Sequence, residues 1–184
     1  GAVHVLPLRG FIMDIELVSY DGGKFALVAM GTEGIAVISL DDPAAPVLLY
    51  EINLGHVLTG VAWADDGGNI TLDNTVTSLT ARVVSLVSDG VDVWIANEEF
   101  GIQRTSLANL LGPGAPAVKP DGTLFTDAEA PTVQYAGENP WGGPVDLVLY
   151  GGRLFAALAF LGMGIYDPGT LEVVGRYNLY TDVS

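Results

Sequence analysis

The feature that most constrains this chain is a short motif that occurs three times. Its first copy, residues 22–40 (GGKFALVAMGTEGIAVISL), is a glycine turn, an apolar run, a second glycine turn and another apolar run. Residues 89–107 align with it without a gap, and residues 151–168 align with one residue fewer before Gly162. Self-similarity of this kind is the sequence signature of a repeat architecture. We therefore expect repeated copies of one small β unit.

Each copy lies within a series of predicted strands and tight turns. Residues 11–20 alternate apolar and polar side chains before an Asp-Gly turn, and residues 25–30 read as a strand buried on both faces. Strands at 35–40 and 47–54 would complete a four-stranded unit of about 45 residues, the size of one propeller blade. The sequence predicts an all-β, β-propeller-like repeat of four-stranded antiparallel blades, with about three blades in all.

The three units are expected to form one domain over residues 1–184. They lie at about 11–54, 80–126 and 144–180, with an inserted hairpin at 60–77, an edge or closing strand within 1–10, and one helical turn at 106–111. In the second unit only 123–126 reads as a fourth strand. Closed propellers have about four to eight blades. The chain is thus expected to be part of a longer propeller, half of a two-copy ring, or a ring to which 60–77 adds a degenerate blade.

Two stretches resemble a known repeat. Residues 34–49 (GIAVISLDDPAAPVLL) resemble the LVIVD-type β-propeller repeat, in which an apolar strand runs into an Asp-Pro turn and a second apolar strand. Residues 145–157 (VDLVLYGGRLFAA) resemble the opening of that repeat, whereas Gln103 and Arg104 interrupt the third strand of the second unit. The resemblance implies a surface or exported scaffold and supplies no catalytic motif.

Charge and cysteine content narrow the function classes. The formal net charge is −15, from 22 acidic and 7 basic residues, which disfavours nucleic acids and anionic lipid and favours cations or basic protein surfaces. The chain has no cysteine, which excludes disulfides, thiolate metal sites and a cysteine nucleophile. Its apolar runs are too short to span a membrane. We expect an extracellular, cell-surface or periplasmic location, with halophilic adaptation as another explanation of the acidity.

The inner strand of each blade is where polar side chains would line a central channel. Alternation places Asp14 and Glu16 on one side of the first inner strand, and the matching phase gives Arg82 in the second unit and Asp146 in the third. These four residues could form a site for a cation or polar ligand, or an acid–base pair of carboxylates with split pKa values. The alternative is structural: Arg82 neutralises the acids, and together they hold the blades in register.

A second acidic cluster lies in the inserted hairpin. Asp65, Asp66, Asn69 and Asp73 offer oxygen ligands at short spacings, as calcium requires, although the spacing is not that of an EF-hand. The same residues also make an ordinary hairpin turn. Calcium is therefore the one candidate cofactor, and none is otherwise expected.

These observations predict a non-enzymatic interaction or structural module on a propeller scaffold. Its partner would be another protein, or a second copy bound through open blade edges, with no nucleic acid and no membrane insertion. One alternative is a propeller hydrolase or lyase that uses the channel carboxylates with a divalent cation. The other is a self-assembling structural subunit. Fold alone does not choose among them.

Overall fold

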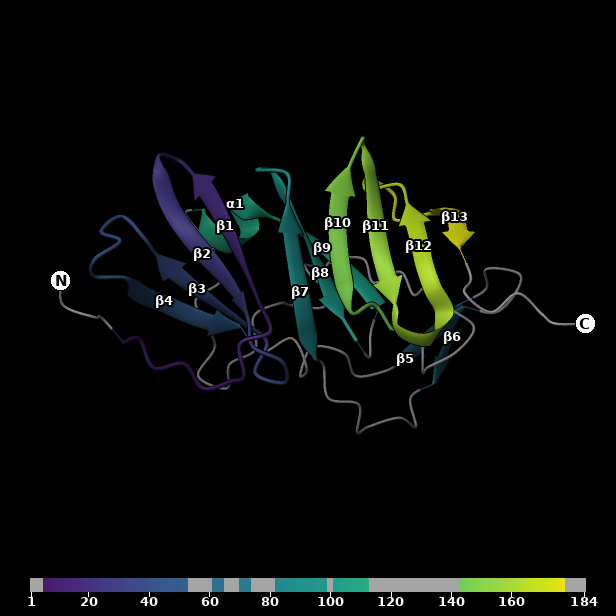
Figure 1. Ribbon diagram of the computed structural model, residues 1–184, viewed down its shortest axis with the longest axis horizontal. Helices are drawn as coiled ribbons and strands as arrows, with labels where there is room; N and C mark the ends of the chain where they lie inside the picture. The colour runs from purple at the N-terminus through teal and green to yellow at the C-terminus, as the bar shows by residue number, and fades with distance from the viewer. Residues whose placement is uncertain are drawn as a thin grey trace, which may run out of the picture.

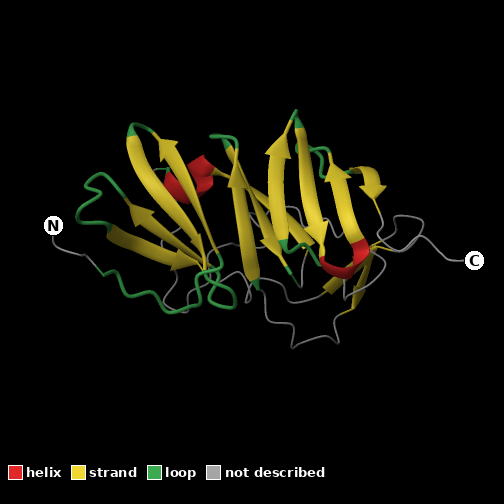
Figure 2. Ribbon diagram, viewed as in Figure 1, coloured by secondary structure: helices red, strands yellow, loops and turns green. Residues whose placement is uncertain are grey.

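The computed structural model describes residues 5–52, 61–64, 70–73, 82–98, 101–112 and 143–177. Strands make up most of this part of the chain, and the helical segments are short (Figure 2). No helix in these ranges is long and apolar enough to cross a membrane.

The first sheet, blade 1, is a four-stranded antiparallel meander in the order β1-β2-β3-β4. Its strands are β1 (Asp14–Tyr20), β2 (Gly23–Ala29), β3 (Ile35–Ser39) and β4 (Val47–Ile52). The turn between β1 and β2 uses Asp21 and Gly22, both with positive φ, as the Asp-Gly pair predicts. From Ala26 to Met30 every side chain is buried, because both faces of β2 are covered.

Blade 3 repeats this meander in the order β10-β11-β12-β13. Its strands are β10 (Asp146–Tyr150), β11 (Arg153–Leu158), β12 (Gly162–Tyr166) and β13 (Val173–Tyr177), with a short 3-10 helix, η2 (Ala159–Leu161), before β12. The two complete blades are the two units in which the repeat is clearest in the sequence.

Blade 2 has three strands in the described residues, in the order β7-β8-β9. They are β7 (Val83–Ser88), β8 (Asp92–Asn97) and β9 (Gly101–Ser106), and the helix α1 (Leu107–Leu111) follows at once. Ser106 caps α1 by accepting a hydrogen bond from the Asn109 N–H at 3.1 Å, which confirms the helical turn predicted at 106–111. The strand expected at 123–126 lies outside the described residues.

Two expectations concern segments outside the blades. The inserted hairpin at 60–77 contains β5 (Val61–Ala64) and β6 (Ile70–Asp73), which pair antiparallel. The edge strand expected within 1–10 is wrong for residues 5–10, which form no strand. Leu6 and Leu8 instead pack their side chains against the outer face of blade 1.

The three blades stand side by side in chain order, with the inner strands β1, β7 and β10 next to one another (Figure 1). One apolar core fills the space between blades 1 and 2, and includes Leu27 and Ile95. A second core, around Trp94 and Tyr166, fills the space between blades 2 and 3. The fold is therefore all-β and propeller-like, because meander sheets pack face to face with their first strands together.

Candidate functional site

The strand registers define one equivalent position on the three inner strands. In each blade the residue at this position pairs with an alanine near the end of the second strand. The pairs are Asp14 with Ala29, Ser85 with Ala96, and Asp146 with Ala157. We call this the junction position.

The register in blade 2 differs from what the sequence pattern suggests. Alternation along the strand predicts Arg82 as the channel-lining residue of blade 2, whereas the structure has Ser85 at the junction position. The cause is a register shift between Val83 and Ser85, where one extra residue breaks the alternation. No signal in the sequence marks this bulge.

Asp14 joins blade 1 to blade 2. Its Oδ2 accepts hydrogen bonds from the Ser85 hydroxyl at 3.1 Å and from the Leu86 N–H at 2.9 Å. Its Oδ1 accepts one from the N–H of Ile15, at 2.8 Å. The carboxylate therefore satisfies a main-chain donor on the free edge of β7, which would otherwise lack a partner there.

Ser85 joins blade 2 to blade 3 in the same way. The Ser85 Oγ accepts from the Leu147 N–H at 3.3 Å, and it lies 3.0 Å from Oδ1 of Asp146, which also accepts from that N–H at 2.9 Å. A serine hydroxyl has one hydrogen to donate, so Asp14 and Asp146 share it. The junction residues of blades 1 and 2 thus each cap the N–H that follows the junction position in the next blade.

Glu16 makes a third contact between blades. Its Oε1 accepts a hydrogen bond from the Ser88 N–H at 2.8 Å. Burial between the blades raises the pKa of Glu16; the Ser88 N–H opposes this shift, and the negative charge of Asp14 adds to it. An upward shift of the pKa is what an acid–base role for Glu16 would require.

Arg82 lies apart from the three carboxylates. It precedes β7, and its guanidinium forms an ion pair with Glu98 at the end of β8. Its main-chain N–H donates to Oδ1 of Asn97 at 3.1 Å. Of the four predicted channel residues, the structure brings together Asp14 and Asp146 at Ser85, with Glu16 further along β1. Arg82 pairs elsewhere.

The calcium candidates cannot be placed as a site. Asp65, Asp66 and Asn69 lie outside the described residues, and Asp73 ends β6 with its side chain likewise outside them. Within the described part of the chain, no group of three or more acidic or histidine side chains could hold a metal ion.

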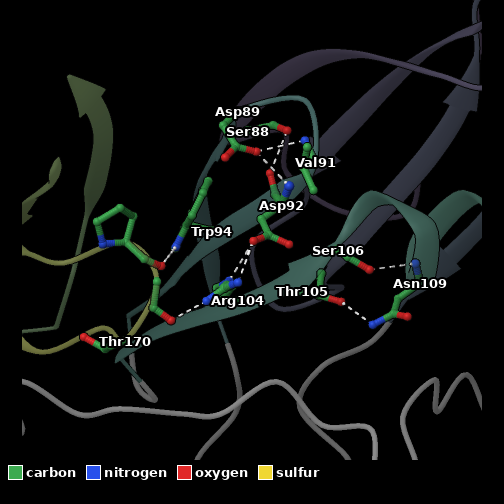
Figure 3. A network of polar contacts seen from close by, with 12 residues as sticks. Ser88, Asp89, Val91, Asp92, Trp94, Arg104, Thr105, Ser106, Asn109 and Thr170 are labelled. Atoms are coloured by element: carbon green, nitrogen blue, oxygen red, sulfur yellow. Dashed lines mark hydrogen bonds and ion pairs between the residues drawn. The ribbon is translucent and has the colours of Figure 1, made fainter. Parts of the chain in front are cut away.

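A second polar network links blades 2 and 3 further from the inner strands (Figure 3). Arg104 on β9 holds Oδ2 of Asp92 through Nε at 2.9 Å and through Nη2 at 2.7 Å, and its Nη1 donates to the carbonyl of Gly169. Trp94 Nε1 donates to the carbonyl of Pro168 at 3.0 Å. Both carbonyls belong to the turn before β13.

That turn is itself ordered by Asp167. Its Oδ1 accepts from the N–H of Thr170 at 3.1 Å and of Gly169 at 2.9 Å, and these two bonds are the main reason that the pKa of Asp167 is lowered. Asp167 and Pro168 form an Asp-Pro pair, like that of Asp42 and Pro43, which by itself favours a turn. The sequence does not indicate that Arg104, which interrupts an apolar strand, contacts this turn.

Comparisons with known proteins add little to this geometry. No protein-family model matches the chain, and no curated protein does. Among solved structures it is similar to the crystal structure of BamB from Moraxella catarrhalis, with 15% sequence identity and a TM-score of 0.37. The match covers 91% of this chain and 53% of that chain, so this chain spans about half the length of the protein it matches. At this TM-score the likeness carries no argument, and the fold assignment rests on the sheet order and inter-blade contacts above.

Proposed function

We propose that the chain is a non-enzymatic interaction and scaffold module that works outside the cytoplasm, at a cell surface or in a periplasm. The observation that carries this proposal is that two carboxylates of the inner strands, Asp14 and Asp146, form hydrogen bonds between blades. Asp14 accepts from the Leu86 N–H and Asp146 from the Ser85 hydroxyl, at the points where consecutive blades meet, so their oxygens stabilise the stack. The location rests on the resemblance to the LVIVD-type repeat.

The binding surface we propose is the acidic end of the blades. β1 and β7 end next to Asp21 and Asp89, and β3, which runs in the same direction as β1, ends before Asp41 and Asp42. All four side chains are exposed on turns. A negative surface of this kind attracts a basic protein partner and speeds the encounter. The loops expected to add contacts, 60–77 and 108–143, lie mostly outside the described residues.

The test is binding of a small basic protein, cytochrome c, measured by titration calorimetry at several salt concentrations. We expect binding that weakens with salt and is reduced in Asp21→Asn/Asp89→Asn. The matched control is Glu33→Gln/Glu51→Gln, which removes the same charge at the opposite end of the blades. Equal loss in both double variants, or no binding at low salt, would contradict an acidic binding end.

An enzymatic function has one observation in its favour, the convergence of two carboxylates on Ser85. A hydrolase or lyase would use Asp14, Glu16 and Asp146 with a divalent cation. Thermal melting in millimolar calcium separates the two functions, because a ligand that binds the native state raises the melting temperature. We expect no shift. A rise that Asp146→Asn abolishes would replace the scaffold proposal by the cation-assisted enzyme.

A further inference from the structure

The residue after the junction position is apolar in all three blades. It is Ile15 in blade 1, Leu86 in blade 2 and Leu147 in blade 3. Leu86 and Leu147 are 3% and 4% exposed because the preceding blade covers them, whereas Ile15 is 52% exposed. Leu17, two residues further along β1, is exposed as well, while its blade 3 equivalent, Leu149, packs into the core between blades 2 and 3. Blade 1 is therefore open at β1 on the side that a preceding blade would cover, whereas Leu6 and Leu8 pack against the β2 and β3 part of that side.

Blade 3 presents the complementary face. Tyr150 is 77% exposed, while Val18, at the same position in blade 1, is 7% exposed under blade 2. Val148 and Met163 on this face are also exposed. The equivalent of Phe155 in blade 2 is Trp94, which is buried against blade 3, whereas Phe155 itself is only half-buried. Blades 1 and 2 each have one face that is covered by the following blade. The outer face of blade 3 has the same pattern of apolar residues as those two covered faces.

The two open faces also carry a hydrogen-bond acceptor and a donor at the positions that form hydrogen bonds between the blades. Asp146 is exposed at the junction position of blade 3, and its contacts with Ser85 and with the Leu147 N–H both use Oδ1. Ile15 carries the N–H that follows the junction position of blade 1, and that N–H reaches its own Asp14, just as the Leu147 N–H reaches its own Asp146. In the internal junction the Leu147 N–H also reaches Ser85 of the preceding blade. Asp146 and Ile15 could form the same contact.

We propose that the outer face of blade 3 binds the exposed β1 side of the outer face of blade 1 in a second copy of this chain, head to tail. At the inner strands this contact repeats the internal junctions: Asp146 of one copy accepts the Ile15 N–H of the other, and Tyr150 and Val148 cover Ile15 and Leu17. Two copies of the three blades that the structure describes make a ring of six, within the range of about four to eight blades that propellers use. A head-to-tail contact closes into a ring when its rotation returns the last blade to the first, and otherwise gives an open filament. This assembly does not depend on the proposed binding of a basic partner.

Engineered cysteines test the contact directly, because the chain has none of its own. In the internal junction Glu16, two residues after the junction position, reaches the N–H of Ser88, three residues after it. The same positions at the open faces are Val148 and Leu17. Val148→Cys and Leu17→Cys on separate molecules are therefore expected to lie side by side across the new interface, with their side chains facing each other.

The experiment mixes the two single variants under mild oxidation, at about 0.3 M salt to screen the charge of each copy. We expect a disulfide-linked heterodimer to form several-fold faster than either homodimer, and the double variant to give a dimer closed by two bonds. The control pairs Val148→Cys with Val91→Cys, an exposed residue on the β7–β8 turn. Cross-linking no faster than in this control would overturn the proposal, and a ladder of higher oligomers would overturn the closed ring.

Light scattering of the unmodified chain gives a second measure. We expect a mass twice that of one chain, falling to one chain in Leu17→Glu or Tyr150→Glu, which place a charge on either open face. Circular dichroism checks that these variants stay folded. A chain that remains monomeric at every concentration would contradict the second copy as the occupant of these faces.

Discussion

The hydroxyl oxygen of Ser85 lies 3.1 Å from Oδ2 of Asp14, although the two residues are 71 positions apart in the sequence. Asp146 approaches the same hydroxyl from the other side, at 3.0 Å. Three inner strands therefore meet at one serine in blade 2, the blade whose repeat is the least regular. The contact is a junction between blades, and its strength should be visible as stability.

Ser85→Ala should lower the free energy of unfolding by about 1–2 kcal/mol, because it leaves Asp14 and Asp146 without their shared buried donor. Urea unfolding measures the change. Ser19→Ala, an exposed serine on β1, is the matched control and should stay within about 0.5 kcal/mol of the unmodified chain. Equal effects of the two substitutions would mean that the junction contributes nothing to stability.

Glu16→Gln should raise the melting temperature at pH 7. Burial raises the pKa of Glu16 above 4.5, so the native state binds more protons than the unfolded chain between 4.5 and that raised pKa. Stability is thus lost as the pH rises through this window, and a neutral glutamine avoids the loss while its amide oxygen still accepts from Ser88. The difference between variant and parent should shrink as the pH falls to about 4.5 and below.

Melting curves from pH 4 to 8 check this sign. Glu33→Gln makes the same change of net charge in the β2–β3 turn, and so separates the local effect of Glu16 from the general relief of self-repulsion. A Glu16→Gln variant that is less stable than the parent at pH 7 would mean that the charged hydrogen bond to Ser88 outweighs burial.

The sequence predicts local structure here far better than it predicts contacts between blades. β2 is an apolar run between glycine turns, and α1 follows a capping serine, so both are readable from a few neighbouring residues. The junction at Ser85 depends on a one-residue shift in β7, which has no sequence signature and moves every later side chain to the other face. For that reason alternation predicts Arg82 at the position where the structure has Ser85.

The Asp-Pro turn of blade 3 is another case in which the sequence predicts the local structure but not the contacts between blades. Asp167 and Pro168 predict a turn by themselves, because aspartate accepts from main-chain groups two and three residues ahead. That Trp94 and Arg104 would hold this turn requires knowing that blades 2 and 3 pack face to face. The partners are long-range consequences of the fold, and no spacing in the sequence encodes them.

Arg104→Lys should loosen this turn. A lysine cannot hold Asp92 and the Gly169 carbonyl together, since it lacks the planar fork of the guanidinium. We expect a loss of about 1–2 kcal/mol in local stability and roughly tenfold faster hydrogen exchange at the Leu171 amide. This N–H donates to the main-chain carbonyl of Asp167 across the turn.

Arg153→Lys is the control for the same turn. Arg153 contacts Oδ2 of Asp167 at 3.2 Å from an exposed position, where an ion pair contributes about 0–1 kcal/mol. Exchange at Leu171 should therefore change little. If Arg153→Lys had the larger effect, the turn would depend on its exposed ion pair and not on its contact with blade 2.

Tyr166→Phe should stabilise the protein, by up to about 2 kcal/mol. The ring is buried in the core between blades 2 and 3, its hydroxyl has no hydrogen-bond partner in the described residues, and burial raises the pKa of Tyr166 to about 12. A buried hydroxyl without a partner costs desolvation energy, and phenylalanine removes that cost while keeping the ring. Urea unfolding measures the gain, and Tyr150→Phe, at an exposed position, should show none.

Gly164→Ala tests whether the ring of Tyr166 is tightly held. A Cβ at Gly164 would lie 2.6 Å from both the hydroxyl and Cε2 of Tyr166, well inside normal contact distance. The substitution should therefore destabilise by about 1–3 kcal/mol through overpacking. Adding Tyr166→Phe should recover only part of this loss, because the clash with the ring carbon remains. Full recovery would mean that the hydroxyl alone opposes a side chain at position 164, and that the ring itself has room to move.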